Sequence, residues 1–374
     1  MYYKRTDKTS SNSQQIIMEI YLVGGAVRDA LLGVADQNTE NDYVVVGSSA
    51  GELLSLGYRQ VGKEFPVFLH PKTHDEYALA RTEKKIAAGY AGFEFDTAST
   101  VSLEEDLSRR DLTINAIAKG ADGVLIDPFF GANDIGLKSL RHVSGAFKED
   151  PVRVLRVARF TSRFYPFGFS IAGETKQLMN EMVDSGEVDS LVPERVFKEL
   201  SLSLSYDKPA IFFDVLLECG AYQRLFPMLD MTKAGILHIA DIQDTGEAAR
   251  FALWLYQQDL DSIKSLCSHL KCPKEYQQLA ELSAGWYLFA KNFKTQSAES
   301  VLDFILATDA FRRRHRFVQL LDVFDCLGIN THPIERLLSD LKKIDISKLD
   351  KKQIAKELAC ERLAVAQSFL DSTK

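Results

Sequence analysis

Two carboxylates stand directly before a short apolar run, and their spacing is that of a metal site. Glu40 and Asp42 precede Tyr43–Val46, a run typical of a buried strand. Side chains two positions apart on an extended chain lie on the same face. Because carboxylate oxygens are the ligands that Mg²⁺ prefers, the pair predicts bound Mg²⁺. The alternative is that both residues are simply solvated.

A glycine pair is the second feature that could take part in binding or catalysis. Gly24 and Gly25 lie where an expected strand at 19–24 meets an expected helix at 26–32, and Arg28 lies in the first turn of that helix. Glycines let the backbone approach a triphosphate, the helix start offers free N–H groups, and a guanidinium adds donors. We therefore expect Gly25 and Arg28 to bind a nucleotide; a plain turn with a surface Arg–Asp pair is the alternative.

Together the two features predict a two-metal reaction. One metal beside the triphosphate would activate an attacking hydroxyl, and the other would stabilise the pyrophosphate leaving group.

The elements that position these residues alternate between strand and helix in the first part of the chain. Strands are expected at 19–24, 43–46, 65–69, 76–81 and 124–126. From about Asp150 onward helical periodicity takes over, at 152–164, 192–204, 208–219, 248–256, 261–270, 299–305, 314–326 and 353–369. The pattern predicts an α/β region followed by an all-helical remainder.

Length and composition set the outer limits. A chain of 374 residues with 46% hydrophobic and 26% charged residues is ordinary for a globular protein of two or three domains. The net charge of −7 argues against a nucleic-acid partner unless basic residues gather locally. No apolar run approaches the roughly 20 residues of a membrane span. Residues 1–15 are largely polar, and we expect residues 1–17 to form a disordered extension.

The five cysteines contain no C-x-x-C pair, which favours reduced thiols in the cytoplasm over disulfides or a zinc site.

Several motifs in the right order resemble one known family. The segments Leu22–Gly33, Tyr43–Gly47, Phe65–Pro71 and Glu76–Glu83 are similar to those of the class II tRNA nucleotidyltransferases. These are the CCA-adding enzymes of the DNA polymerase beta-like nucleotidyltransferase superfamily, and the likeness is nearest to the gamma-proteobacterial type. It implies an α/β head at 18–140, a helical neck at 141–229, and a helical body and tail at 230–374.

The resemblance also implies a reaction. It is the template-independent addition or repair of the 3′-terminal CCA of tRNA, with CTP, ATP and Mg²⁺. The RNA 3′-hydroxyl would attack the nucleotide α-phosphate and release pyrophosphate. An adenosine-only tRNA nucleotidyltransferase or a poly(A) polymerase is the nearest alternative, and an RNA-binding protein with a degraded active site is the second.

Further site residues follow from the same resemblance. Arg110 matches an arginine that contacts the sugar and triphosphate. Asp150 and Arg153 match the nucleotide-selecting pair, in which a carboxylate accepts from the amino group of cytosine or adenine and a guanidinium donates to the adjacent ring nitrogen. Guanine and uracil present the opposite pattern on these atoms. Arg156 and Arg159 would point at phosphates.

Three segments have implied structural roles. Asp127–Gly131 matches a flexible joint between head and neck, and Pro193–Glu199 matches a motif that buttresses the neck. The loop Arg81–Asp106 has the length that accompanies addition of the terminal adenosine.

The sequence departs from the family in two places. Glu40 stands where the family has Asp, in a slightly longer segment, which leaves Asp36 as an alternative ligand. Gln258 occupies a position that is histidine in relatives with a metal-dependent phosphohydrolase domain. We therefore expect a degenerate phosphohydrolase-like region without that activity.

Basic residues gather in the last part of the chain. They form a cluster at 311–316 and a stripe at Lys342, Lys343, Lys348, Lys351, Lys352 and Lys356. We expect these residues to contact tRNA phosphates; solvated helix faces are the alternative.

Overall fold

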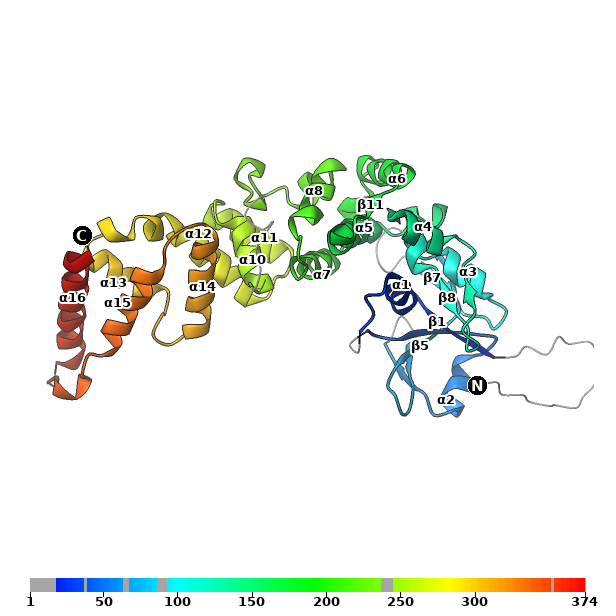
Figure 1. Ribbon diagram of the computed structural model, residues 1–374, viewed down its shortest axis with the longest axis horizontal. Coiled ribbons are helices and arrows are strands. Elements are labelled where there is room, and N and C mark those ends of the chain that lie inside the picture. Colours follow the sequence, from blue (N-terminus) through cyan, green and yellow to red (C-terminus); the bar gives the residue numbers. More distant parts are fainter. Residues whose placement is uncertain are drawn as a thin grey trace, which may run out of the picture. The chain divides into compact units, whose positions relative to one another are not determined.

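The computed structural model describes residues 18–36, 39–62, 67–85, 93–236, 245–350 and 353–373 (Figure 1). The chain forms two compact units. The first unit is Met1–Arg195 with Val215–Arg224, and the second is Val196–Asp214 with Leu225–Lys374. The predicted head and most of the predicted neck belong to the first unit. The predicted N-terminal extension lies outside the described residues.

A seven-stranded sheet dominates the first unit, with strand order β3-β4-β5-β2-β1-β8-β9. Its strands are β1 (Glu19–Val23), β2 (Asp42–Val46), β3 (Arg59–Val61), β4 (Val67–Leu69), β5 (Glu76–Leu79), β8 (Ala118–Lys119) and β9 (Leu125–Ile126). Two smaller pairs are the antiparallel hairpin of β6 (Thr82–Lys85) and β7 (Phe93–Asp96), and the parallel β10 (Ser139–Leu140) and β11 (Ser170–Ile171). The short β11 lies in a stretch that we expected to be entirely helical.

Helices complete both units. In the first unit they are α1 (Gly25–Leu32), α2 (Ala50–Ser55), α3 (Leu103–Ser108), α4 (Gly131–Leu137), α5 (Val152–Phe164) and α6 (Gly173–Asp184). Residues of both units occur in α7 (Pro193–Leu204), α8 (Ala210–Glu218) and α9 (Ala221–Leu225). The second unit has α10 (Glu247–Leu255), α11 (Leu260–His269), α12 (Lys274–Lys291), α13 (Ala298–Ala307), α14 (Arg314–Cys326), α15 (His332–Lys342) and α16 (Ile354–Thr373). The predicted α/β head followed by a largely helical region is confirmed.

Strand register brings the glycine pair and the acidic pair to one edge of the sheet. Val23 ends β1 and pairs with Asp42, which begins the antiparallel β2. Gly24 follows β1 at once and caps α1. On its other side Asp42 pairs with Glu76, the first residue of the parallel β5. The turn into α1 and the starts of β2 and β5 therefore meet at the same edge.

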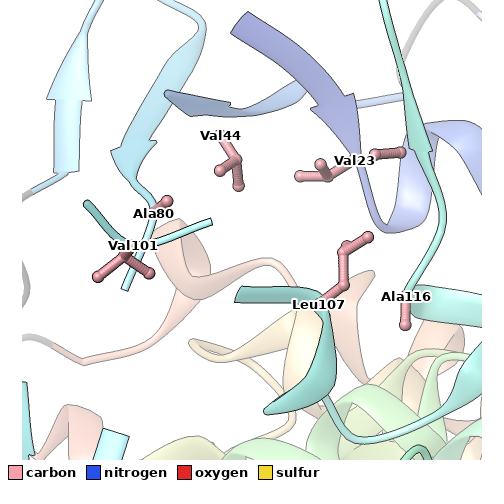
Figure 2. Packing of buried hydrophobic residues seen from close by; sticks show 7 residues of the cluster. Val23, Val44, Ala80, Val101, Leu107 and Ala116 are labelled. Carbon is pink, nitrogen blue, oxygen red and sulfur yellow. The ribbon is translucent and has the colours of Figure 1, made fainter. Parts of the chain in front are cut away.

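Alternation along β2 decides which face of the sheet Asp42 occupies. Val44 packs into a cluster with Val23, Leu107 and Ala116, all nearly inaccessible to solvent (Figure 2). Val45 packs into a separate cluster with Leu53, Phe68 and Leu79. Because positions 42 and 44 share a face, Asp42 lies on the side of the sheet that α3 covers through Leu107.

The segment predicted to be a joint begins a helix in this structure. The Asp127 carboxylate accepts hydrogen bonds from the N–H groups of Gly131 (2.7 Å) and Ala132 (2.9 Å), at the start of α4. A Cβ atom on Gly131 would lie 2.1 Å from the Thr113 carbonyl oxygen. Glycine is required here by close backbone contact.

Phe130 is strained, and relieving the strain is expected to stabilise the first unit. Its φ of 58° and ψ of 32° are left-handed, while the residue as a whole is 72% exposed. An L-residue with a Cβ pays about 1 kcal/mol for this conformation, and asparagine tolerates it better. Phe130→Asn should therefore raise the free energy of unfolding by about 0.5–1 kcal/mol in a urea titration.

Lys138 has the same conformation, with φ of 57°, so Lys138→Asn should shift stability in the same direction. A lower unfolding free energy for Phe130→Asn would mean that contacts of the ring outweigh the backbone strain.

Candidate active site

The turn at Gly24 holds Arg110 against the start of α1. Gly24 has a φ of 66°, and its N–H donates to the Ile117 carbonyl oxygen at 3.3 Å. A Cβ atom there would lie 3.0 Å from Nη1 of Arg110. The positive φ and the close guanidinium both favour glycine. Gly25 is the first residue of α1, so the predicted cradle residue does stand at a helix start beside a positive charge.

Three charged side chains, those of Glu76, Glu40 and Arg110, act on the Asp42 carboxylate. Its side chain is open to solvent, yet the surrounding protein desolvates the carboxylate enough to raise its pKa. Glu76, its partner on β5, raises the pKa further, and Glu40 adds to this, whereas the Arg110 guanidinium lowers it. Desolvation is thus the main cause of the raised pKa, and the two neighbouring carboxylates add to it against the opposing charge of Arg110.

The donor set at this edge suits a divalent cation. Carboxylates that repel one another are stabilised when a cation binds between them, and Mg²⁺ takes oxygen ligands. Within the described parts of the chain, however, no three His, Cys, Asp or Glu side chains already lie close enough to hold a metal. The chemistry therefore fits Mg²⁺, while the ligands are not gathered into a finished site.

The two candidate first ligands, Asp36 and Glu40, differ in their contacts. Asp36 belongs to a local turn, in which its N–H donates to Thr39 Oγ1 at 2.9 Å and its carboxylate accepts from the same hydroxyl at 3.3 Å. Glu40 is exposed and acts electrostatically on Asp42.

A buried carboxylate aims the two arginines that follow α3. Asp106 accepts from Arg109 Nη2 at 2.6 Å and from Arg110 Nη2 at 3.1 Å. Burial alone would raise the pKa of Asp106, but the two guanidinium charges outweigh it and hold the pKa below its usual value. Arg109 also donates to the Arg81 carbonyl oxygen, which gives it a structural role. The Nε atom of Arg110 is buried without a hydrogen-bond partner, while 18% of the side chain is exposed to solvent.

Arg28 is committed to the interior. Its Nε donates to Asp29 at 2.8 Å and its Nη1 to Asn115 Oδ1 at 2.5 Å. The guanidinium lies 5.4 Å from the ring centroid of Phe160 and 5.0 Å from that of Phe164, both on α5. Burial lowers its pKa. In this structure Arg28 therefore ties α1 to α5.

The predicted base-selecting pair is held by contacts of its own. Asp150 accepts a two-point salt bridge from Arg195, Nη1 to Oδ1 at 3.0 Å and Nη2 to Oδ2 at 2.7 Å. Arg153 is buried and donates to the carbonyl oxygens of Ala146 (2.7 Å) and Arg109 (2.6 Å). The structure thus places both residues at the start of α5 with fixed orientations.

Arg156 and Arg159 gather around one aromatic ring. Their guanidinium carbons lie 5.4 and 4.3 Å from the centroid of Phe160, the ring that Arg28 also covers. Arg156 donates through Nε to Asp111 at 2.7 Å. Burial would raise the pKa of Asp111, but Arg156 above all holds it far below its usual value.

Sequence reasoning missed several residues that shape this site. Glu76 could have been found, because it begins a strand as Asp42 does. Asp106, Asn115 and Arg163 gave no comparable signal, since their contacts depend on the fold. Arg163, for example, reaches across from α5 to Asp29 at 2.9 Å.

In the second unit Gln258, which the resemblance placed at a histidine position, makes contacts of a structural kind. It is buried, its Oε1 accepts from the Asp230 N–H at 3.0 Å, and its Nε2 donates to the Asp230 carbonyl oxygen at 2.7 Å. The amide therefore hydrogen-bonds to both backbone groups of one residue, with its oxygen as acceptor and its nitrogen as donor.

Removing this amide is expected to destabilise the second unit. Gln258→Ala leaves the Asp230 N–H without this partner, while the Asp230 carbonyl oxygen keeps the Lys233 N–H at 3.0 Å. We therefore expect a loss of about 1–2 kcal/mol in unfolding free energy, measured by denaturant titration. The neighbouring Gln257 is exposed, and Gln257→Ala should change stability by less than about 0.5 kcal/mol. Equal effects of the two variants would contradict the role given to Gln258.

The basic cluster of 311–316 is partly tied down. Arg312 and Arg313 pair with Asp309 at 2.8 and 3.4 Å, and Arg316 donates to Gln278 at 2.9 Å. Arg312 nevertheless exposes 85% of its side chain. Of the predicted lysine stripe, Lys351 and Lys352 lie outside the described residues. None of the described helices combines the length and the apolar character that crossing a membrane requires.

The sheet edge and its flanking helix starts define the class of protein. An Asp at the start of a central strand, a Gly-Gly helix start beside it and an arginine between them are the parts of a nucleotidyltransferase head. In agreement, residues 20–141 match the family model described as "Poly A polymerase head domain" and residues 168–232 match "Probable RNA and SrmB- binding site of polymerase A".

Within that class, the chain belongs to the family of CCA-adding enzymes. It is 46% identical over 352 residues to the CCA-adding enzyme of Coxiella burnetii (strain RSA 493 / Nine Mile phase I), covering 92% of this chain and 93% of that protein. It is also 46% identical over 341 residues to the Multifunctional CCA protein of Shewanella frigidimarina (strain NCIMB 400), covering 81% and 82%.

Solved structures share the fold at lower identity. A CCA-adding enzyme in complex with CTP superposes with a TM-score of 0.67 at 21% identity, over 94% of this chain and 87% of that one. The Thermotoga maritima CCA-adding enzyme complexed with tRNA_CCA gives a TM-score of 0.67 at 20% identity, over 96% and 92%.

Proposed function

We propose that this protein builds or repairs the 3′-terminal CCA of tRNA with CTP and ATP. The RNA 3′-hydroxyl attacks the α-phosphate of the nucleotide, and pyrophosphate leaves. The observation that carries the proposal is the meeting of the Gly24 turn, Asp42 and Arg110 at one sheet edge, in a chain that is 46% identical to CCA-adding enzymes along most of its length. The five cysteines are free thiols, which is consistent with action in the cytoplasm.

The metal at this site is proposed to be Mg²⁺, held by Asp42 and Glu40 with Glu76 beside them. When bound it supplies Lewis-acid activation of the hydroxyl and charge neutralisation at the phosphates. The chain's own residues provide the rest. Arg110 offers its partly exposed guanidinium to a phosphate or sugar oxygen, and the start of α1 at Gly25 offers N–H groups.

Base selection is proposed for Asp150 and Arg153. The carboxylate accepts from the amino group that cytosine and adenine share, and the guanidinium donates to the neighbouring ring nitrogen. Their fixed orientations at the start of α5 support this role, because selection without a nucleic-acid template needs a rigid reading surface.

One assay separates the proposed function from its alternatives. Purified protein is incubated with Mg²⁺, one labelled nucleotide at a time, and tRNA transcripts that end before CCA, after C, or after CC. We expect CTP to extend the first two and ATP only the third, with no signal in EDTA. ATP incorporation without CTP incorporation would support the adenosine-only enzyme, and repeated adenosine addition a poly(A) polymerase. No incorporation on any transcript would support an RNA-binding protein.

The cluster at 311–316 is proposed to contact tRNA phosphates. Arg312→Gln combined with Arg314→Gln should weaken tRNA binding and reduce the slope of log Kd against log salt by about 2, or about 1 per lost phosphate contact. The control is Lys264→Gln, an exposed residue on α11 that pairs only loosely with Asp261 at 3.7 Å. An unchanged slope in the double variant would place the RNA elsewhere.

A further inference from the structure

We propose that Arg195 is a positioning residue for base selection, which it controls by fixing the carboxylate of Asp150. The inference rests on the proposed role of Asp150 as a base reader. It gives Arg195, from the first turn of α7, a part in nucleotide choice and not only in supporting the helices around it.

The contact has a geometry that fixes orientation. Both terminal nitrogens of Arg195 donate to Asp150, one to each carboxylate oxygen, at 3.0 and 2.7 Å. Such a fork restrains rotation of the carboxylate as well as its position. The two residues are distant in the sequence, so the pair is a tertiary contact and not a product of local helix spacing.

A third hydrogen bond completes the restraint. Oδ1 of Asp150 also accepts from the Val152 N–H at 3.1 Å, where α5 begins. A carboxylate oxygen has two acceptor sites, so both sites on Oδ1 are occupied while Oδ2 is engaged by Arg195 Nη2. The second acceptor site of Oδ2 is the one that these contacts leave for another donor.

A single fixed acceptor is what the proposed selection requires. The amino group of cytosine or adenine donates to it, whereas the carbonyl oxygen of uracil or guanine at the same place meets an acceptor and is repelled. A carboxylate that is free to rotate presents its oxygens in many directions and admits a bridging water, which would accept the wrong base. Arg153 is restrained similarly, through the carbonyl oxygens of Ala146 and Arg109.

The test compares Arg195→Met and Arg195→Lys with the wild type. For each protein kcat/KM is measured for ATP against GTP on a transcript ending in CC, and for CTP against UTP on one ending before CCA. We expect Arg195→Met to reduce both discrimination ratios by about 10-fold or more. Without the fork the Asp150 carboxylate is no longer oriented, so its hydrogen bond with the base amino group is weakened. Arg195→Lys offers a point charge without the two-point geometry, so its discrimination ratios should lie between those of the wild type and Arg195→Met.

Two controls separate positioning from support of the fold. Arg224→Met removes an exposed guanidinium from its salt bridge with Asp189, also in the first unit, and should leave both ratios unchanged. In an Asp150→Ala background, Arg195→Met should cause no additional loss of discrimination, because its effect passes through the carboxylate.

The outcomes are distinct from failure of the proposed function. Wild-type discrimination in Arg195→Met or Arg195→Lys, or a further loss of discrimination on top of Asp150→Ala, would overturn the inference while the enzyme remains a CCA-adding one. Unchanged discrimination in Asp150→Ala alone would instead refute Asp150 as the base reader. A wild-type protein that incorporates neither nucleotide would refute the proposed function itself.

Discussion

Replacing Asp42 with asparagine is expected to reduce incorporation of both CTP and ATP by about a thousandfold. The change removes one anionic oxygen from the sheet edge where Glu40, Glu76 and Arg110 converge, and it keeps the shape of the side chain. Because the pKa of Asp42 is raised, its charge opposes its surroundings in the unliganded protein. The variant should therefore lose activity while its melting temperature stays the same or rises.

The control is Asp75→Asn, an equal change one position before β5. Asp75 accepts from Thr73 Oγ1 at 2.6 Å and is not among the charges that act on Asp42, so incorporation should stay close to the wild type. Glu40→Ala tests the second ligand. If it retains full activity while Asp42→Asn does not, Glu40 is not a ligand, and a fully active Asp42→Asn would refute the metal edge altogether.

Replacing Gly131 with alanine is expected to destabilise the first unit by about 3 kcal/mol or more. The new Cβ would stand 2.1 Å from the Thr113 carbonyl oxygen, 2.7 Å from its carbon and 2.8 Å from a side-chain atom of Ile117. Two of these contacts are backbone atoms, which cannot swing aside. Denaturant titration measures the loss, and nucleotide incorporation should fall with it, since Thr113 lies close in the chain to Arg110.

Helix α4 supplies its own control. Gly136 has no atom within 4 Å of an added Cβ, so Gly136→Ala should stabilise the protein by about 0.5–1 kcal/mol through helix propensity. If both alanines had similar effects, the close packing at Gly131 would not be what requires glycine there.

The sequence predicted those helices and strands of the site whose formation depends on neighbouring residues. The continuous apolar run after Asp42 indicated β2, and the glycine pair followed by helical spacing indicated α1 and its start. The helix at 152–164 has the predicted bounds, and the one at 192–204 differs by one residue. These elements carry their signal in neighbouring residues, which is why sequence alone was sufficient.

Other parts depend on tertiary contacts that no local pattern records. The 18-residue α12 escaped prediction, because small, aromatic and polar residues alternate along it without a clear apolar stripe. Arg28 was expected to face a phosphate, but Asn115 and two phenylalanines from α5 surround it. The salt bridge of Asp150 with Arg195 likewise joins residues whose proximity only the fold creates.

The pairing of Val23 with Asp42 has a consequence for how the enzyme can vary. The backbone ladder between β1 and β2 sets the position of Asp42, so the length of chain between Gly33 and Asp42 does not. Extra residues in such a connection carry little entropic cost, so its length can vary. The same connection is therefore a suitable place for a peptide insertion in an engineered enzyme. It lies close to Asp42 in the chain, yet its length does not set the position of Asp42.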